Sequence, residues 1–301
     1  MRQEFCQTLL EFSARPEFVF LTGDLGFKAL EPLREAMGQR FINAGVAEQN
    51  MVGVAAGLAK SGLRPWAYSI APFLYARPLE QIRNDVCLHN LPVVLVGNGG
   101  GYGYGVMGST HHALEDYGVL LTLPNMRAYI PAFDSDVRCM IQELMTVKHP
   151  AYLRLGLSEQ PSWLEPGPYA AWRRILPGDG PTVAFVGPLA GAALDAIRES
   201  ALNADCWLVS ELPIHRPPPE FLSSVRNSGY LLVVEEHVSG GGFGQRVACE
   251  LLAAGVCPTR FVHRPALGYI SGLYGSQGFH RRECGLDPAS IVSELNHAAD
   301  S

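Results

Sequence analysis

The chain alternates between short, continuously apolar segments and longer segments in which apolar residues recur with helical spacing. This alternation favours a mainly parallel sheet with helices on both faces. In the first half we expect strands at Phe18–Leu21, Arg64–Tyr68, Val93–Val96, Ala128–Ile130 and Tyr152–Leu155, and helices at 3–12, 48–60, 76–88, 114–121 and 134–147.

A stretch rich in Pro, Gly and Trp, Gly156–Gly180, interrupts this pattern and is typical of a domain linker. The alternation then resumes, with strands expected at Thr182–Val186, Cys206–Val209, Leu231–Val234 and Arg260–Val262, and helices at 189–201, 219–227, 243–254 and 288–298. The sequence therefore predicts an α/β protein of two doubly wound domains, residues 1–156 and 181–301, joined by a linker at 157–180.

Composition narrows the class of protein without naming a function. The 301 residues are 48% hydrophobic and 17% charged, with a formal net charge of −6 and no run of like charges, which disfavours a nucleic-acid or membrane surface. The N-terminus carries Glu4 where a signal peptide needs an apolar core, and no apolar run is long enough to span a bilayer. The seven cysteines form no CxxC pair, which favours reduced thiols in a cytoplasm over a disulfide framework or a zinc site.

One acid stands at a position where chemistry is expected. Glu48 lies between the glycine turn at Gly45 and the apolar helical segment 51–59. Desolvation at such a helix start raises the pKa of a carboxyl group, so that it can hold or share a proton. The alternative is that Glu48 only stabilises the positive end of the helix dipole.

Three further segments hold polar or aromatic residues next to expected strands. Asp24 follows the first strand, where ligands of open α/β sheets bind, although it could simply cap a turn. Phe73 and Tyr75 offer flat apolar faces for a heterocycle, or an ordinary core pair. The stretch 103–108 satisfies GxGxxG, a dinucleotide signal of low specificity here, and runs into His111 and His112, which could shuttle protons or cap a helix.

Taken together, segments 40–50, 68–85 and 103–116 resemble the transketolase family, which includes deoxyxylulose-phosphate synthases and the beta subunits of 2-oxo-acid dehydrogenases. The resemblance is strong over residues 20–155 and weaker after 180. It implies that the chain is the C-terminal subunit of a split transketolase, with a pyrimidine-binding domain and a C-terminal domain. The Glu235–Gly244 segment resembles a structural turn of that second domain.

The resemblance also implies roles for single residues. Glu48 would activate thiamine diphosphate, Phe73 and Tyr75 would form the stacking wall for its aminopyrimidine ring, and Asp24 would lie on its thiazolium side. His111, with His112 beside it, would face the reacting carbon. Many relatives carry a phenylalanine where this chain has Ile70.

No metal site is expected in this chain. Gly178–Gly180 with Asn203 mimics the Gly-Asp-Gly…Asn motif that binds Mg²⁺ and diphosphate, but it precedes a strand and lacks the helix of that motif, so we interpret it as a turn. Mg²⁺ and the diphosphate would then be held by an N-terminal partner subunit, in an assembly expected to be α2β2.

The substrate side departs from ordinary transketolases. Met107, Gly99 and Leu157 stand where relatives carry an aspartate, a histidine and a phosphate-binding arginine. Three basic residues could compensate: Arg2, Lys28 and Arg154. The sugar acceptor is therefore expected to differ from an ordinary pentose phosphate.

Other classes stay open at this stage. A beta subunit of a 2-oxo-acid dehydrogenase would decarboxylate its substrate and pass an acyl group to a lipoyl carrier, and an enzyme like deoxyxylulose-phosphate synthase is a further alternative. A non-catalytic scaffold or nucleotide-binding module would use the GxGxxG stretch instead. Retention of Glu48 and His111 argues against a scaffold.

Overall fold

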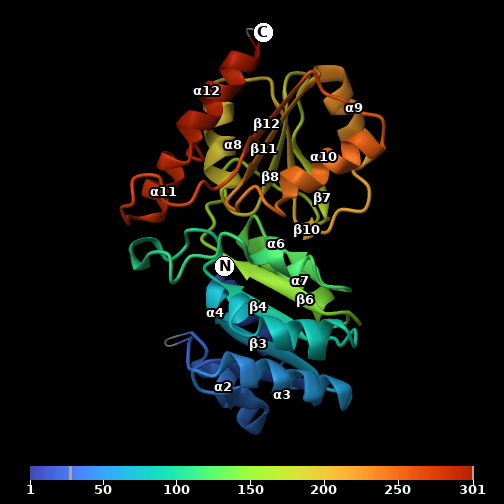
Figure 1. Cartoon of the computed structure of the whole chain (residues 1–301), viewed down its shortest axis with the longest axis vertical. Coiled ribbons are helices and arrows are strands. Elements are labelled where there is room, and N and C mark those ends of the chain that lie inside the picture. Colours follow the sequence, from blue (N-terminus) through green and yellow to red (C-terminus); the bar gives the residue numbers. More distant parts are fainter. Residues whose placement is uncertain (27–28, 300–301) are drawn as a thin grey trace.

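The two sheets of the protein lie one above the other along its long axis in the computed structural model, which describes residues 1–26 and 29–299 (Figure 1). The first sheet has seven strands in the order β10-β5-β6-β4-β3-β1-β2. Their bounds are β1 Phe18–Thr22, β2 Phe41–Asn43, β3 Arg64–Ile70, β4 Val94–Asn98, β5 Arg127–Tyr129, β6 Ala151–Leu155 and β10 Glu211–Leu212. All neighbours pair in parallel except β10 and β5.

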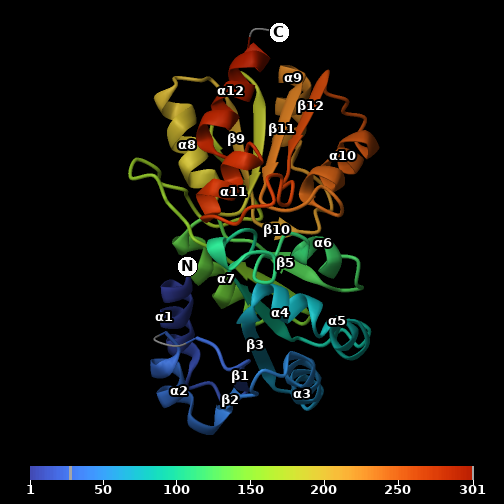
Figure 2. The same ribbon diagram turned by 60° about the vertical axis from the view of Figure 1, so that its left-hand side comes forward.

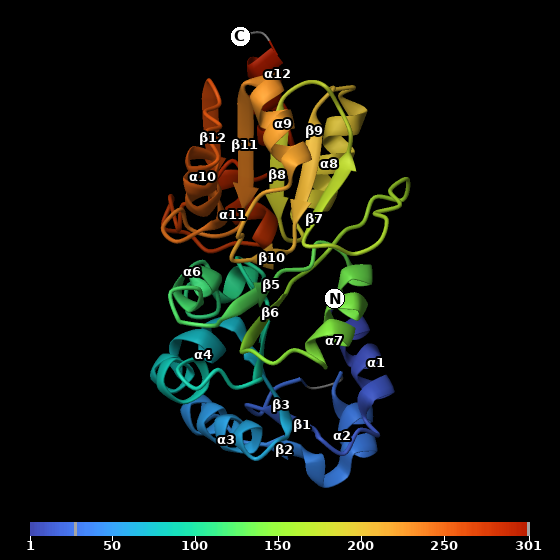
Figure 3. The same ribbon diagram turned by 90° about the vertical axis from the view of Figure 1, so that its right-hand side faces the viewer.

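Helices cover both faces of the first sheet (Figure 3). One face carries α1 (Arg2–Phe12), α2 (Glu31–Met37) and α7 (Asp134–Leu144). The other face carries α3 (Glu48–Lys60), α4 (Ala71–Ala76) and α6 (Asp116–Leu120). The central strands read as continuous apolar runs because both of their faces are buried under helices.

The second sheet has the order β12-β11-β8-β9-β7. Its strands are β7 Trp172–Leu176, β8 Thr182–Val186, β9 Asp205–Val209, β11 Tyr230–Glu235 and β12 Arg260–Arg264, and β7 alone pairs antiparallel. Helices α8 (Ala190–Glu199) and α12 (Pro288–Ala299) lie on one side, and α9 (Pro219–Ser228) and α10 (Phe243–Ala253) on the other (Figure 2). The predicted class of two α/β domains with mainly parallel sheets is confirmed.

The structure differs from the sequence prediction in short or interrupted elements. The sequence did not predict α4, which ends where the helix expected at 76–88 should begin. Pro78, which lacks the N–H that a continuous helix needs, separates α4 from α5 (Leu79–Gln81), and a π-helix follows at Ile82–Cys87. Strand β7 lies inside the expected linker and joins the second sheet. The sequence reading also missed β2, β10, α2 and α11 (Gln277–Glu283), all of which are short. The domain boundaries at 156 and 181 stay a prediction.

Among the described residues, no helix is both long enough and apolar enough to cross a membrane.

Candidate active site

Glu48 stands where the carboxyl ends of three parallel strands meet. Gly45, with a φ of 69°, turns the chain between β2 and α3, and Glu48 is the first residue of that helix. The Glu48 side chain is only 2% exposed. Ser69, near the end of β3, donates a hydrogen bond to Glu48 Oε1 at 3.4 Å, and a Cβ on Gly23 would lie 3.7 Å from the same oxygen. This is the sheet edge at which open α/β folds bind ligands.

An arginine that the sequence reading did not select completes this corner. Nη1 of Arg77 lies 2.8 Å from both carboxylate oxygens of Glu48. The Arg77 guanidinium carbon also lies 3.9 Å from the centre of the Phe73 ring. The signal for it was present, because Arg77 follows Phe73 at i+4 in the helical segment. A surface pocket here is lined by Val46, Ala47, Glu48, Gln49, Asn50 and Arg77.

His111 joins the same group from a different segment of the chain. Its ring lies edge-on to Phe73, with centroids 5.1 Å apart, and 5.9 Å from the ring of Tyr104. Its Nδ1 is hydrogen-bonded to Thr110 Oγ1 at 2.9 Å. The structure therefore brings together Glu48, Phe73 and His111, which the sequence reading selected from three separate segments.

The other two predicted cofactor residues, Asp24 and Tyr75, have different partners. Asp24 is exposed in a left-handed conformation with φ 60°, and its Oδ1 accepts a hydrogen bond from Asn43 at 2.8 Å. Tyr75 is buried, and its hydroxyl donates to Glu115 Oε2 at 3.1 Å, on the side of α4 that meets α6. Of the two predicted aromatic residues, Phe73 is the one whose ring contacts His111 and Arg77.

His112 is held away from solvent by two partners. Its Nε2 donates to the Gly105 carbonyl at 2.8 Å, and its Nδ1 accepts from the Tyr269 hydroxyl at 2.8 Å. Burial lowers the pKa of His112, and both hydrogen bonds suit the neutral ring. This arrangement fixes the loop between β4 and α6 and leaves His111, which is half-exposed, as the histidine able to meet a substrate.

The substrate-side substitutions have a structural counterpart. Gly99 has a φ of 76°, and a Cβ there would lie 2.2 Å from the Tyr104 ring, so Tyr104 fills the space beside residue 99. The Tyr104 hydroxyl accepts a hydrogen bond from Asn98 at 2.8 Å. Sequence reasoning missed Tyr104, because its packing over a glycine five positions earlier leaves no pattern. Met107 and Leu157 are exposed.

The compensating basic residues differ in their placement. Arg154 is buried. It pairs with Asp116 at 2.8 Å and donates hydrogen bonds to the carbonyl oxygens of Ala113 and Glu236, so its guanidinium group binds partners inside the protein. Arg2 lies in the first turn of α1. Burial raises the pKa of the Tyr104 hydroxyl, and the hydrogen bond from Asn98 and the charge of Arg2 offset only part of that rise. Lys28 lies outside the described residues.

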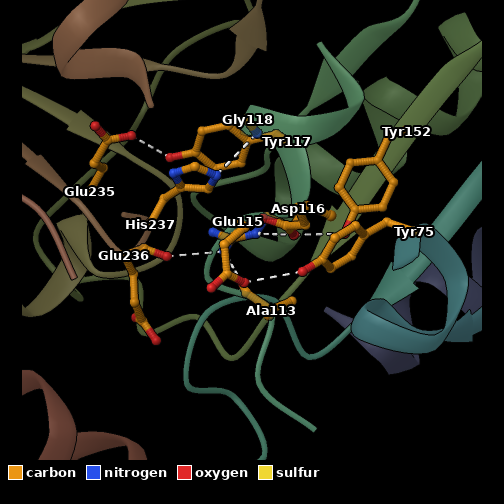
Figure 4. A network of polar contacts seen from close by, with 12 residues as sticks. Tyr75, Ala113, Glu115, Asp116, Tyr117, Gly118, Tyr152, Glu235, Glu236 and His237 are labelled. Carbon is orange, nitrogen blue, oxygen red and sulfur yellow. Dashed lines mark hydrogen bonds and ion pairs between the residues drawn. The ribbon is translucent and has the colours of Figure 1, made fainter. Parts of the chain in front are cut away.

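Behind this group, a buried polar network joins the two domains (Figure 4). Tyr117 donates to Glu235 Oε2, and its ring stacks on His237 with centroids 3.8 Å apart. The His237 Nε2 accepts from the Gly118 N–H at 3.0 Å, and burial lowers the His237 pKa. These contacts support the structural role expected for the Glu235–Gly244 segment.

The Gly178–Gly180 segment forms a tight bend against Asn203. The Gly180 N–H donates to the Asn203 carbonyl at 2.7 Å, and the Asp179 N–H to its side chain at 3.2 Å. Within residues 1–26 and 29–299, no group of three or more His, Cys, Asp or Glu side chains is placed to hold a metal ion.

Two α/β domains of this topology, with a buried glutamate at a strand-to-helix turn, define a transketolase-like protein. The family model of the transketolase pyrimidine-binding domain matches residues 7–160, and the chain belongs to the transketolase family. One of the subunits of the apulose-4-phosphate transketolase from Phocaeicola vulgatus is 30% identical, covering 90% of this chain and 89% of its own. The corresponding subunit from Actinobacillus succinogenes is 31% identical, covering 87% and 86%.

A solved structure of a related protein is similar to this chain over nearly its whole length. A split gene transketolase, in the form of an inactive beta4 tetramer, superposes with a TM-score of 0.83 at 28% identity, covering 99% of this chain and 97% of that one. The resemblance found in the sequence is therefore confirmed: the chain is homologous to the subunit of split transketolases that carries the pyrimidine-binding domain and the C-terminal region.

Proposed function

We propose that this chain is one subunit of a thiamine-diphosphate-dependent transketolase that moves a two-carbon ketol unit from a ketose donor to a sugar aldehyde. The observation that carries the proposal is a group of three side chains at one sheet edge: the buried carboxylate of Glu48 and the ring of Phe73, which both contact Arg77, and His111, whose ring contacts Phe73. A carboxylate beside a stacking face and an open surface pocket suits an aminopyrimidine ring. When bound, thiamine diphosphate supplies the nucleophilic carbon and the electron sink for this reaction.

The chain's own side chains bind and orient the cofactor and the substrate. Glu48 shares a proton with the pyrimidine nitrogen, and burial keeps water from competing for that hydrogen bond. Phe73 orients the flat ring by stacking. His111 is half-exposed and next to Phe73, so it can hydrogen-bond a substrate hydroxyl or move its proton. Asp24 would face the thiazolium ring of the bound cofactor, the role that the family resemblance implies.

A partner subunit completes the enzyme in this proposal. The two apulose-4-phosphate transketolase relatives are each named as one subunit of their enzyme, which supports a partner subunit. In this proposal the partner is the N-terminal subunit, it holds Mg²⁺ and the diphosphate, and the two subunits form an α2β2 assembly in the cytoplasm. We expect the isolated chain to be inactive and to bind thiamine diphosphate poorly. Calorimetry with and without the partner tests this, and tight Mg²⁺-dependent binding by the chain alone would contradict it.

The decisive variant is Glu48→Gln in the assembled complex. It keeps the side-chain size but replaces the group that shares a proton, so exchange of the thiazolium C2 proton, followed by NMR, should fall by about 10²-fold or more. Glu80→Gln is the matched control, because Glu80 is an exposed carboxylate on the neighbouring helical segment and exchange should not change. Wild-type exchange in Glu48→Gln would leave Glu48 as a helix-end charge only.

The substrate proposal follows from the side of the site beyond His111. Met107 and Leu157 are exposed apolar side chains at the positions where relatives of this family carry a hydroxyl-binding aspartate and a phosphate-binding arginine, and Tyr104 covers Gly99. Such a site suits an unphosphorylated, branched or carrier-linked sugar. Two relatives are named for apulose 4-phosphate, which belongs in the test set. Values of kcat/KM for apulose 4-phosphate, ribose 5-phosphate and unphosphorylated aldehydes test this, and a clear preference for ribose 5-phosphate would overturn it.

A further inference from the structure

Arg77 contacts the two side chains that are proposed to receive the aminopyrimidine ring. Its Nη1 donates to both carboxylate oxygens of Glu48, at 2.8 Å each. Its guanidinium carbon lies 3.9 Å from the centre of the Phe73 ring, within the range of a cation–π contact. Arg77 therefore combines a hydrogen bond to a buried carboxylate with packing on an aromatic face.

These are also the two interactions that an aminopyrimidine needs from this corner. A guanidinium is planar and delocalised, donates hydrogen bonds in its plane and stacks on aromatic rings. An aminopyrimidine ring is flat as well, stacks through its faces and hydrogen-bonds through its edge. Both groups therefore require the Glu48 carboxylate and the Phe73 ring, and they compete for the same contacts.

The burial of the pair shows which partner can move. The Glu48 side chain is 2% exposed, whereas the Arg77 side chain is 42% exposed and borders the surface pocket. Among the described residues, Glu48 is the one side chain that accepts hydrogen bonds from the Arg77 guanidinium. A long, half-exposed side chain held at one end by one carboxylate can rotate into solvent without disturbing the core.

We propose that Arg77 competes with the aminopyrimidine ring for Glu48 and Phe73, and has to leave both before the cofactor can seat. This inference rests on the proposed function, because Glu48 and Phe73 receive the ring there. Its consequence is that the apparent cofactor affinity is reduced to the fraction of time in which Arg77 is away from the carboxylate. Arg77 would also cover the buried Glu48 carboxylate until the cofactor binds in the complex with the partner subunit.

The test is calorimetric titration of the complete two-subunit complex with thiamine diphosphate at fixed Mg²⁺. We expect Arg77→Ala to bind about tenfold more tightly than the wild type, which corresponds to Arg77 occupying the site about 90% of the time. Arg77→Lys keeps the charge but lacks the planar group that packs on Phe73, so its gain should be smaller. Unchanged or weaker binding by Arg77→Ala would overturn the proposal, weaker binding meaning that Arg77 helps to hold the cofactor.

Matched variants separate this outcome from failure of the proposed function. Arg83→Ala removes an exposed arginine from the same segment, whose guanidinium bonds its neighbour Asn84 and makes no contact with Glu48 or Phe73, and should bind as the wild type does. Phe73→Ala should weaken binding if the ring stacks there.

If Phe73→Ala and Glu48→Gln leave both cofactor affinity and C2 exchange unchanged, the proposed function fails. If these two variants weaken cofactor binding and slow C2 exchange, but Arg77→Ala does not bind the cofactor more tightly, only the proposed competition by Arg77 is wrong. Should Arg77→Ala not assemble, Arg77→Gln, also uncharged, takes its place with the same expected gain in affinity.

Discussion

Tyr117 is the residue through which the contact between the domains can be measured. Its side chain is fully buried in α6, and its hydroxyl donates to Glu235 Oε2 at the end of β11. Burial raises the Tyr117 pKa well above its usual value, so the hydroxyl keeps its proton and acts as the donor. Tyr117→Phe removes that hydrogen bond and preserves the ring that stacks on His237.

The size of the effect follows from the other donors to Glu235. The carboxylate also accepts hydrogen bonds from Phe243 N at 2.8 Å, Gly244 N at 2.9 Å and His263 Nε2 at 2.7 Å. A hydrogen bond to a charged group contributes about 1.5–3 kcal/mol. Since three donors remain and no cavity forms, we expect the free energy of unfolding to fall by about 1.5 kcal/mol, at the lower end of that range.

Urea unfolding followed by circular dichroism measures this difference, and the m-value should stay unchanged. Tyr129→Phe is the matched control, because Tyr129 is equally buried but its hydroxyl bonds only Glu143, an exposed carboxylate of the same domain, at 3.1 Å. It should lose less than about 1 kcal/mol. Equal losses in the two variants, or a loss below about 0.5 kcal/mol for Tyr117→Phe, would refute the reasoning.

Three further predictions concern pH, a glycine and the acceptor. Burial lowers the pKa of four histidines: His112, His149, His237 and His280. The unfolded chain therefore binds more protons than the folded one below about pH 6.5, so the stability present above that pH should be lost as pH falls. Urea unfolding between pH 7.5 and 5.5 should show that the free energy of unfolding decreases toward low pH, and His112→Gln should reduce this slope. A free energy of unfolding that does not change with pH would contradict the prediction. Gly99→Ala places a Cβ against the Tyr104 ring and should cost about 1–3 kcal/mol, more than Gly62→Ala, where φ is also positive but the space is open; equal losses by urea unfolding would argue against the clash. Leu157→Arg should raise kcat/KM for ribose 5-phosphate relative to unphosphorylated aldehydes, and an unchanged ratio would count against the alignment at this position.

The start of α3 shows what the sequence could predict. A glycine turn, one acid and an apolar helical run are local features, and the structure places the helix at Glu48–Lys60 as expected. The strands were predictable because parallel strands covered on both faces are continuously apolar. The approach of Glu48, Phe73 and His111 then follows from strand ends sharing one sheet edge.

The remaining features depend on contacts between residues far apart in the chain. Strand β10 has two residues and exists through its pairing with β5, so it carries no pattern of its own. Arg77 has the right helical spacing from Phe73, but its turn toward Glu48 is decided by a buried carboxylate on another helix. Tyr104 over Gly99 is a packing relation that single-residue patterns do not encode.

The second domain acts on the candidate site through the loop that carries His111. The Tyr102 N–H donates to Glu236 Oε1 at 2.6 Å, and the Val238 N–H donates to the Leu114 carbonyl at 2.9 Å, so the loop is fastened to the second domain on both sides of His111. His111 itself has ring contacts with Phe73 and Tyr104 and one hydrogen bond with Thr110, so its position also depends on these two hydrogen bonds to the second domain and on the bond between His112 and Tyr269. A domain that supplies no member of the Glu48, Phe73 and His111 group thereby determines how one of them faces the substrate.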